Sequence, residues 1–529
     1  MSKITNFLLL SFLSGLLLTF SSCTSDTPAV EGLVGKSGTT NVTAFVPNTA
    51  TNLGVINLRK ILDKADYTAV QQMAFFKDWA NQNIGDNPKL MEILQDPALS
   101  GVDINGDIAY FSTDNKDGVV LLPVADKAKM DAAIQNLNTG GDLPSEQKEG
   151  YTLVTFSKNS FLVYNDKIAL LMPVNNATRI QSILDADAAN GIQQNEAFAK
   201  SYQDRKDIFT WSADDDVLVD MLEQDYPEVL TGLNMIQIPT EQLRGNAVSS
   251  NFEFQDGRMV GNTTLHINDA LQNNLGRLVP NKLVSNYTAT FPTDNLLAAL
   301  TLGIDPSKLA TQIANRGSEQ MASMATEQRI GLSVSQIKTA LVGDMAIAVY
   351  GGEKPAALLV VGVKDESLIE NALRTLGAEK KGTEWQFKAS MQGVENNPFV
   401  YTIRIKDNML YAATEITLLE KAMTGGHDNS TLKQLSDGWM GFYLDKKNID
   451  ASNESITKLL KFNLMKATAE VNLNDLATMQ LVVKDNVASS SIDLVKKDEN
   501  ALKVIMKYLE SKYQEKQSIE DEFEEFEEF

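Results

Sequence analysis

The strongest constraint on the fold is that the chain repeats its own pattern of turns and apolar runs, at a separation of roughly 230 to 245 residues. The pair Gly106-Asp107 corresponds to Gly343-Asp344, and each pair opens a β-rich segment. Apolar runs follow at residues 119–124 and 358–363, and runs of this length are typical of buried strands. A period this long indicates a duplicated domain, because solenoid repeats recur about every 20 to 50 residues.

An amphipathic helix is predicted after each of these two strands. Asp126 and Asp365 stand where an N-cap carboxylate would accept a hydrogen bond from an amide of the first turn. Apolar residues follow at the same four offsets in both copies: Met130, Ala133, Ile134 and Leu137 in the first, and Ile369, Ala372, Leu373 and Leu376 in the second. This spacing places each set on one helical face, which we expect to be buried.

Hairpins also recur in the same order. Turns at Asn165-Asp166 and Lys406-Asp407 are each followed by a strand and then by a helix, and turns at Asp256-Gly257 and Asp485-Asn486 come near the end of each copy. Asp, Asn and Gly suit turns that need positive φ. Short turns require antiparallel neighbours, so we predict an α+β fold with mixed or antiparallel sheets and helices on one face.

The repeat also divides the chain into segments. We predict a first α+β repeat at residues 41–283 and a second at 284–512, with the boundary in the short, semi-polar stretch near 280–290. Such a stretch favours two copies that pack against each other. Helices at 70–83 and 309–324 would occupy matching positions, and their methionines, Met73, Met321 and Met324, are expected to fill the core.

The N-terminus has the pattern of a lipoprotein signal peptide. Lys3 precedes an apolar run at 7–20, and Ser21 and Ser22 lead into Cys23, the one cysteine of the chain. We therefore predict that residues 1–22 are removed, that Cys23 carries the lipid (palmitate-type acyl chains), and that 23–40 form a tether. The alternative is an uncleaved anchor helix with an incidental cysteine. The residues after Cys23 favour the outer membrane and leave its periplasmic or surface face open.

The C-terminal segment 513–529 is acidic, with Phe at every third position of its last residues. Like charges repel and a few Phe cannot form a core, so a disordered tail is predicted. The alternative is a docking motif for a basic partner. A net charge of −22 argues against nucleic acid as a partner.

No catalytic signature is recognisable. His266 and His427 are the two histidines, and no nucleophile elbow, phosphate loop or zinc motif is present, so we expect no catalytic residue, no metal and no cofactor. Asp214-Asp215-Asp216 is interpreted as a helix start. The segment 103–107, with Asp103, Asn105 and Asp107, suggests a calcium loop but lacks its glycine and distal glutamate, so a structural turn is favoured.

The signal peptide, Val46-Pro47, Gly106-Asp107 and the helix capped by Asp126, together with their second copies, resemble the Bacteroidota lipoproteins grouped as domain of unknown function 4836. The resemblance implies an envelope lipoprotein without assigned activity. We expect a non-catalytic binding or scaffolding module with an envelope protein or glycan as partner. One alternative is a carboxylate-dependent glycan hydrolase that stacks sugars on Trp79, Trp211, Trp385 or Trp439. Another is a structural subunit of an envelope complex.

Overall fold

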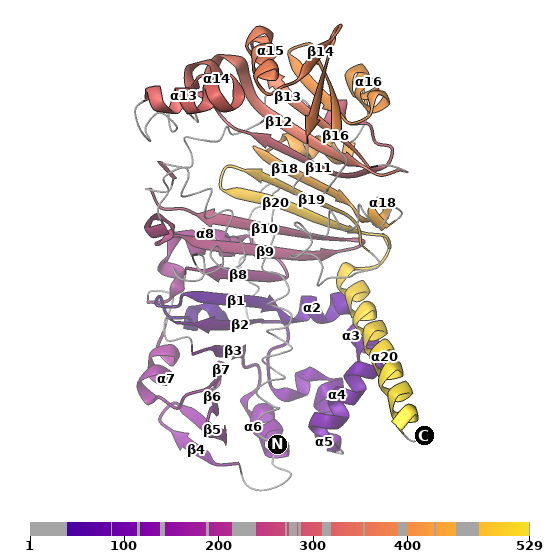
Figure 1. Ribbon diagram of the computed structural model, residues 1–529. Helices are drawn as coiled ribbons and strands as arrows, with labels where there is room; N and C mark the ends of the chain where they lie inside the picture. Colours follow the sequence, from indigo (N-terminus) through magenta and orange to yellow (C-terminus); the bar gives the residue numbers. More distant parts are fainter. Residues whose placement is uncertain are drawn as a thin grey trace.

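The computed structural model describes residues 40–85, 87–113, 117–137, 143–186, 190–213, 240–269, 287–308, 319–352, 355–389, 399–427, 430–450 and 476–527, together with positions 219, 272–273 and 283. A single antiparallel sheet runs through the molecule, with the first half of the chain at one end and the second half at the other (Figure 1). The expected α+β class is therefore confirmed, and every strand pairing in the described residues is antiparallel.

The first half contributes ten strands: β1 (Asn52–Asn57), β2 (Asp107–Ser112), β3 (Val119–Pro123), β4 (Ser145–Lys148), β5 (Tyr151–Ser157), β6 (Ser160–Tyr164), β7 (Ile168–Met172), β8 (Ile208–Ser212), β9 (Ala247–Gln255) and β10 (Arg258–His266). Their order across the sheet is β4-β5-β6-β7-β3-β2-β1-β8-β9-β10.

The second half contributes another ten: β11 (Leu296–Gly303), β12 (Leu341–Tyr350), β13 (Ala356–Val363), β14 (Glu379–Lys381), β15 (Glu384–Ala389), β16 (Phe399–Lys406), β17 (Met409–Ala413), β18 (Met440–Asp445), β19 (Leu476–Lys484) and β20 (Val487–Leu494). Their order is β14-β15-β16-β17-β13-β12-β11-β18-β19-β20, which matches the first half strand for strand. Strand β10 pairs with β20, from Arg258 opposite Asp493 to Thr264 opposite Val487, and joins the two halves.

The turns are those the residue types predict. At the β9–β10 turn Gly257 has φ of 64°, and a Cβ there would stand 2.5 Å from the Cα of Lys497, so only glycine fits. In the matching β19–β20 turn, Asp485 takes positive φ. The turn before β17 is formed by Asp407 and Asn408, which both have positive φ, as a type I′ hairpin turn requires.

Both capped helices form where the sequence predicts them. Helices α6 (Lys127–Asn136) and α15 (Glu366–Thr375) begin after Asp126 and Asp365, whose carboxylates accept hydrogen bonds from Lys129 N and Leu368 N. The fourth apolar residue of each predicted face is an exception, because Leu137 and Leu376 are 42% and 43% exposed. Each is the C-cap residue, so it lies past the last turn that contacts the sheet.

Helices cover both faces of the sheet, so the expectation of helices on one face is wrong. Face A, which carries Phe209 and Tyr443, is covered in the first half by η1 (Val42–Phe45), α7 (Ala177–Leu184), η3 (Ile192–Gln194) and α8 (Glu196–Gln203). In the second half it is covered by η5 (Tyr287–Thr290), α16 (Ile416–Thr424), α17 (Ser430–Lys433) and η6 (Gln434–Ser436).

Face B, which carries Ile208 and Leu444, packs against α2 (Leu58–Ala65), α3 (Tyr67–Val70), α4 (Ala74–Ile84), α6, α14 (Val334–Ala340), α15, α18 (Lys446–Asp450) and α20 (Ala501–Glu527). The remaining helical segments are α5 (Pro88–Gln95), η2 (Pro97–Ser100), η4 (Thr240–Leu243) and α13 (Glu319–Ile330). The physical reason is visible in β3, whose residues are apolar on both sides, and a strand of that kind requires two covering layers.

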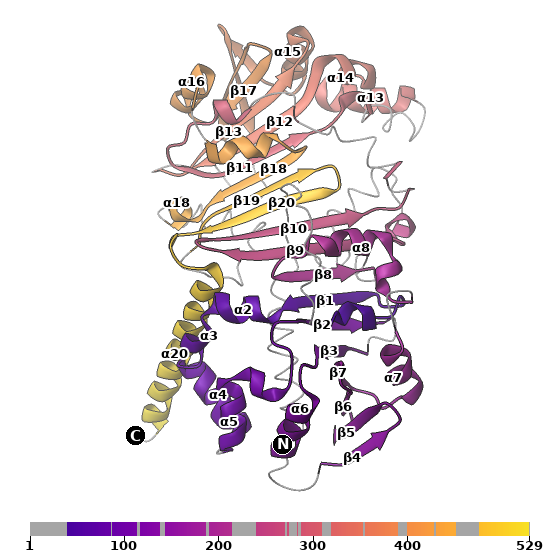
Figure 2. The ribbon, with the colours of Figure 1, turned by 180° about the vertical axis from the view of Figure 1, so that it is seen from behind.

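The last helix of the chain returns to the first half. Helix α20 runs beside α2, α3 and α4 in Figure 1, and Figure 2 shows the same arrangement from behind. Lys503 Nζ lies 2.6 Å from a carboxylate oxygen of Asp66, and Tyr513 donates to Asp78 over 3.0 Å. The predicted disordered tail is therefore wrong as far as Glu527, because helix α20 continues to that residue.

The two predicted methionine-bearing helices are only partly as expected. The first is broken into α3 and α4, and Met73 between them is half-buried against the core of face B. In the second, residues 309–318 lie outside the described residues, and Met324 on α13 is 55% exposed, so it does not fill a core. The side chain of Met321 is not described. No helix in the described residues is long and apolar enough to cross a bilayer.

Candidate functional site

A polar groove of about 300 Å³ lies on face A where the two halves meet. Its floor is formed by β9 and β10 of the first half and by β20 and β19 of the second. The lining residues are Lys206, Asn251, Glu253, Gln255, Arg258, Val260, Gly261, Asn262, Gln434, Gln480, Val482, Ser489, Ser490 and Ser491. The groove therefore lies between the two apolar cores of face A.

Strand alternation explains why this floor is polar. Asn251 and Ser489 both face Asn262 across the sheet, and Ser491 lies in the next row, opposite Val260 and Gln480. The intervening residues of the same strands, among them Phe254, Met259, Ile492 and Leu494, belong to the core under α20 on face B. Successive side chains point to opposite sides of a strand, so one side of these strands is buried and the other side is hydrophilic.

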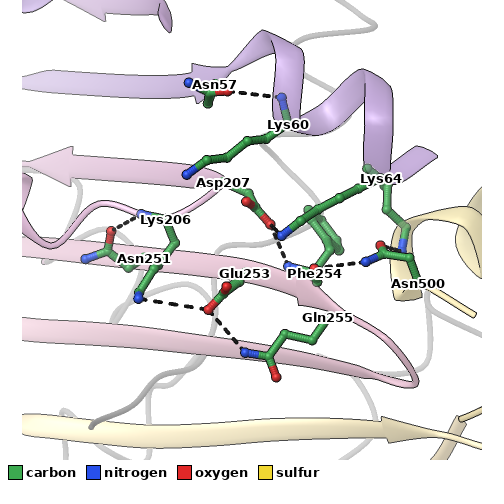
Figure 3. Close-up of polar contacts among 11 residues, drawn as sticks. Asn57, Lys60, Lys64, Lys206, Asp207, Asn251, Glu253, Phe254, Gln255 and Asn500 are labelled. Atoms are coloured by element: carbon green, nitrogen blue, oxygen red, sulfur yellow. Dashed lines mark hydrogen bonds and ion pairs between the residues drawn. The ribbon is translucent and has the colours of Figure 1, made fainter. Parts of the chain in front are cut away.

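The charged side chains of the groove are paired with one another. Lys206 Nζ lies 4.0 Å from a carboxylate oxygen of Glu253, and Gln255 also donates to Glu253 over 3.2 Å (Figure 3). Arg258 Nε donates to Asp493 over 2.7 Å. Burial alone would raise the pKa of Asp493, but the hydrogen bond and charge of Arg258, with help from Lys497, hold it below its ordinary value.

The neighbour of Lys206 anchors this part of the sheet from the opposite side. The buried carboxylate of Asp207 accepts from Lys64 Nζ over 2.5 Å and from the amide of Phe254 over 2.7 Å. Asn500 donates to the carbonyl of Phe254 over 3.1 Å (Figure 3). Helix α2, strand β9 and the start of α20 are therefore tied together behind the groove floor.

One lining residue has an unsatisfied polar atom. The Oδ1 atom of Asn262 is buried, and no donor within the described part of the chain reaches it. A buried acceptor left without a partner costs about 1–3 kcal/mol. A hydroxyl or amide group bound in the groove would satisfy it.

The two histidines have structural contacts in different elements. His266 on β10 has its Nε2 atom 2.9 Å from Ser249 Oγ and 3.1 Å from Ser201 Oγ, and its ring packs on Trp211. Burial, and then the charge of Lys200, lower its pKa, so the imidazole is neutral at pH 7. Ser249 is buried and Ser201 is partly exposed. His427 is partly exposed after α16, with Nε2 3.0 Å from the carbonyl of Lys421.

The segment 103–107, whose residue types suggest a calcium loop, forms a hydrogen-bonded turn. Asp103 Oδ1 accepts from the amide of Asn105 over 3.0 Å. The carboxylate of Asp107 accepts from Asn57, Tyr202 and Arg205 and so links β2 to β1 and α8. In the portion of the chain that the structure describes, no three potential ligands gather around a metal site. Cys23 and Asp214-Asp215-Asp216 lie outside the described residues.

The four tryptophans do not line a common surface. Trp211 lies in the face A core of the first half, and Trp385 in the face B core of the second. Trp79 packs against Phe76 on α4, and Trp439 donates to the carbonyl of Asp485. None of them lines the groove, so the feature on which the glycan-hydrolase alternative depended is not brought together.

Sequence reasoning did not find the groove. Its available signals were the run Ser489-Ser490-Ser491, which marks a polar strand, and the alternation of Asn251, Glu253 and Gln255, which marks a strand with one hydrophilic side. Neither signal says that β10 and β20, which are far apart in the sequence, become neighbours.

Comparisons with known proteins give one family and two structures. A family model described as "Domain of unknown function (DUF4836)" matches residues 41–351. Crystal form IV of TP0453 is similar over 43% of this chain and 81% of its own, at 8% identity and a TM-score of 0.25. Crystal form I of TP0453 covers 74% of this chain and 98% of its own, at 7% identity and a TM-score of 0.20. No curated protein matches.

Proposed function

The chain belongs to the DUF4836 family, a domain of unknown function, and from that premise we propose that it is a lipid-anchored envelope protein that binds a ligand in its polar groove without catalysing a reaction. The observation that carries the proposal is the place of the groove. Both halves supply its floor, Asn262 offers it a buried acceptor, and helices on either side leave it open between two cores.

The matching strand orders support a second part of the proposal, that the halves are copies of one unit. On this view the first copy (41–283) supplies the β9–β10 hairpin and the second copy (284–512) supplies the β19–β20 hairpin. The binding groove forms where the two hairpins pair. Helix α20, which packs on the first half, would then be an addition that holds the pair together.

The lipid anchor is proposed at Cys23, after removal of residues 1–22, with the tether 23–40 leading to the sheet. Two or more acyl chains give stable membrane attachment, whereas one gives marginal binding. We place the protein at the outer membrane. Replacing Cys23 by Ser should abolish labelling by radioactive palmitate and move the protein from the membrane pellet to the soluble fraction. Labelling that survives this change contradicts the anchor.

Asp493, next to the groove, does not have the character of a general acid. A glycosidase needs a carboxylic acid whose pKa is raised, so that it is protonated and can donate to the leaving group. The pKa of Asp493 is shifted the other way, and Glu253 is engaged by Gln255. We therefore propose no general-acid role for Asp493.

Hydrogen exchange tests the binding site. Purified mature protein, incubated with a soluble extract of its own cell envelope, should become protected in β9, β10, β19 and β20 and nowhere else to the same degree. The variant Ser489→Arg, which fills the groove, should lose this protection. Protection that persists in the variant, or conversion of the bound molecule into product, would overturn the proposal.

A further inference from the structure

We infer that the ligand of the groove is an uncharged glycan chain. The inference rests on the proposed function and goes further by naming the chemical class of the ligand. Three properties of the lining favour such a ligand: the pairing of its charges, the mixture of donors and acceptors, and the absence of a free strand edge among the described strands of the floor.

The charged side chains of the groove do not favour binding of an ionic ligand. Lys206 is near Glu253, and Arg258 is bonded to Asp493, so each cation has its own carboxylate. A phosphate or uronate would have to compete with Glu253 or Asp493 for these cations, which weakens its binding. A neutral ligand meets no such penalty.

The other polar side chains are of the kind that suits sugar hydroxyls. Five amides and two hydroxyls of face A line the groove: Asn251, Gln255, Asn262, Gln434, Gln480, Ser489 and Ser491. Each of these groups carries both a donor and an acceptor, and so does each hydroxyl of a sugar. Adjacent strands of the floor are about 4.8 Å apart, so the lining forms a regular grid along which successive hydroxyls can bond.

Two neighbouring side chains on face A are suited to such bonds. Asn262 Oδ1 is the unsatisfied acceptor, and a sugar hydroxyl would donate to it. Ser491 stands on the adjacent strand, one row along, and is half-buried on the groove side. The amide oxygen of Asn251, which is the strand partner of Asn262, already accepts from the backbone of Lys206 (Figure 3), so the free hydrogen-bonding group of its amide is the nitrogen, a donor.

A peptide fits this site less well. Peptides that bind sheets usually add a strand to a free edge. Here β9, β10, β20 and β19 are each paired on both sides, so their backbone groups are already used. The apolar side chains of the lining are Val260 and Val482, which form no pocket for the side chains of a peptide.

The test uses the full mature protein and three sets of probes: an array of neutral oligosaccharides, an array of uronate and sulfated oligosaccharides, and a library of unmodified peptides. Hits are titrated by calorimetry against wild type, Asn262→Ala, Ser491→Ala and the control Asn81→Ala. Asn81 is exposed on α4, away from face A, so its loss repeats the chemical change without touching the groove. Circular dichroism and melting temperature confirm that each variant is folded.

We expect a neutral oligosaccharide to bind, with about tenfold weaker affinity for Asn262→Ala and for Ser491→Ala and no change for Asn81→Ala. Groove-dependent binding of peptides or of acidic oligosaccharides alone would overturn the glycan class and leave the proposed binding function intact. If no probe of any class, and no component of the envelope extract, responds to the groove variants, both proposals fail.

Discussion

Single residues in this protein act mainly by joining elements that are distant in the sequence. Asp207 is 2% exposed and is held by Lys64 on one side and by the amide of Phe254 on another. Burying a carboxylate costs free energy unless hydrogen bonds and an opposite charge replace its hydration. The same reasoning makes Asn262 the weak point of the groove floor, since its acceptor has no partner in the described chain.

Removing Lys64 should therefore destabilise the first half. For Lys64→Met we expect a loss of about 1–3 kcal/mol in the free energy of unfolding, less than for a fully buried pair because Lys64 is partly exposed. Urea unfolding measures this, with the exposed pair member Lys148→Met as control. An effect no larger than that of the control would show that Asp207 is satisfied by backbone groups alone.

The acid dependence of stability should reveal Asp493. Its pKa is lower in the folded state than in the unfolded state, so its contribution is present above about pH 4 and is lost as the pH falls through the folded value. Wild type should therefore exceed Asp493→Asn in stability at pH 7 by more than at pH 3. Urea unfolding measures both stabilities. If wild type and Asp493→Asn differ in stability by the same amount at both pH values, the pairing of Asp493 with Arg258 is not coupled to folding.

At the scale of elements, the helix pair α4 and α20 shows how a distant segment completes local structure. Met73, the N-cap residue of α4, has no capping side chain. The carboxylate of Glu510 on α20 accepts instead from the amides of Ala74 and Phe75, over 2.9 and 3.3 Å. The negative charge also favours the positive end of the α4 dipole.

Replacing this distant cap should loosen α4 locally. We expect Glu510→Ala to reduce stability by about 0.5–2 kcal/mol and to speed hydrogen exchange in α4 before that in β9. Glu510→Gln keeps an acceptor oxygen and should have a smaller effect. Uniform acceleration across the first half would instead indicate that Glu510 supports the whole docking of α20.

The whole molecule depends on the union of β10 with β20 and on α20. The isolated segment 41–283 would expose the backbone of β10, and it would lose Ala501, Leu502, Val504 and Met506 from the face B core. Unpaired edges associate with other chains. The edge strands of the intact sheet, β4 and β14, are short and charged, which protects them.

We therefore expect the segment 41–283, expressed alone, to elute as dimers or aggregates in size-exclusion chromatography, while the full mature chain elutes as a single species. Adding back α20 through a linker should restore part of the stability but not the monomeric state, because β10 still lacks a partner. A well-folded monomer of 41–283 would contradict this view of the joint.

The local elements were largely predictable from the sequence, because their causes are local. Alternating and continuous apolar runs define strands, Asp126 and Asp365 define helix starts, and Asp256-Gly257 defines a tight turn. Even the order of elements in the two halves follows from comparison of those patterns. The C-terminal helix was missed because its ordering depends on contacts with Asp66, Asp78 and the start of α4, which its own composition does not contain.

The sequence by itself determined the α+β class, the repeated order of strands and helices, and the absence of a recognisable catalytic motif. Only the tertiary structure decided that two hairpins more than two hundred residues apart would pair as β10 and β20 and so place Asn262 beside Ser489. The physical reason is that strand pairing uses backbone groups common to all residues. A strand's own sequence therefore tells which side is buried, but not which distant strand lies next to it.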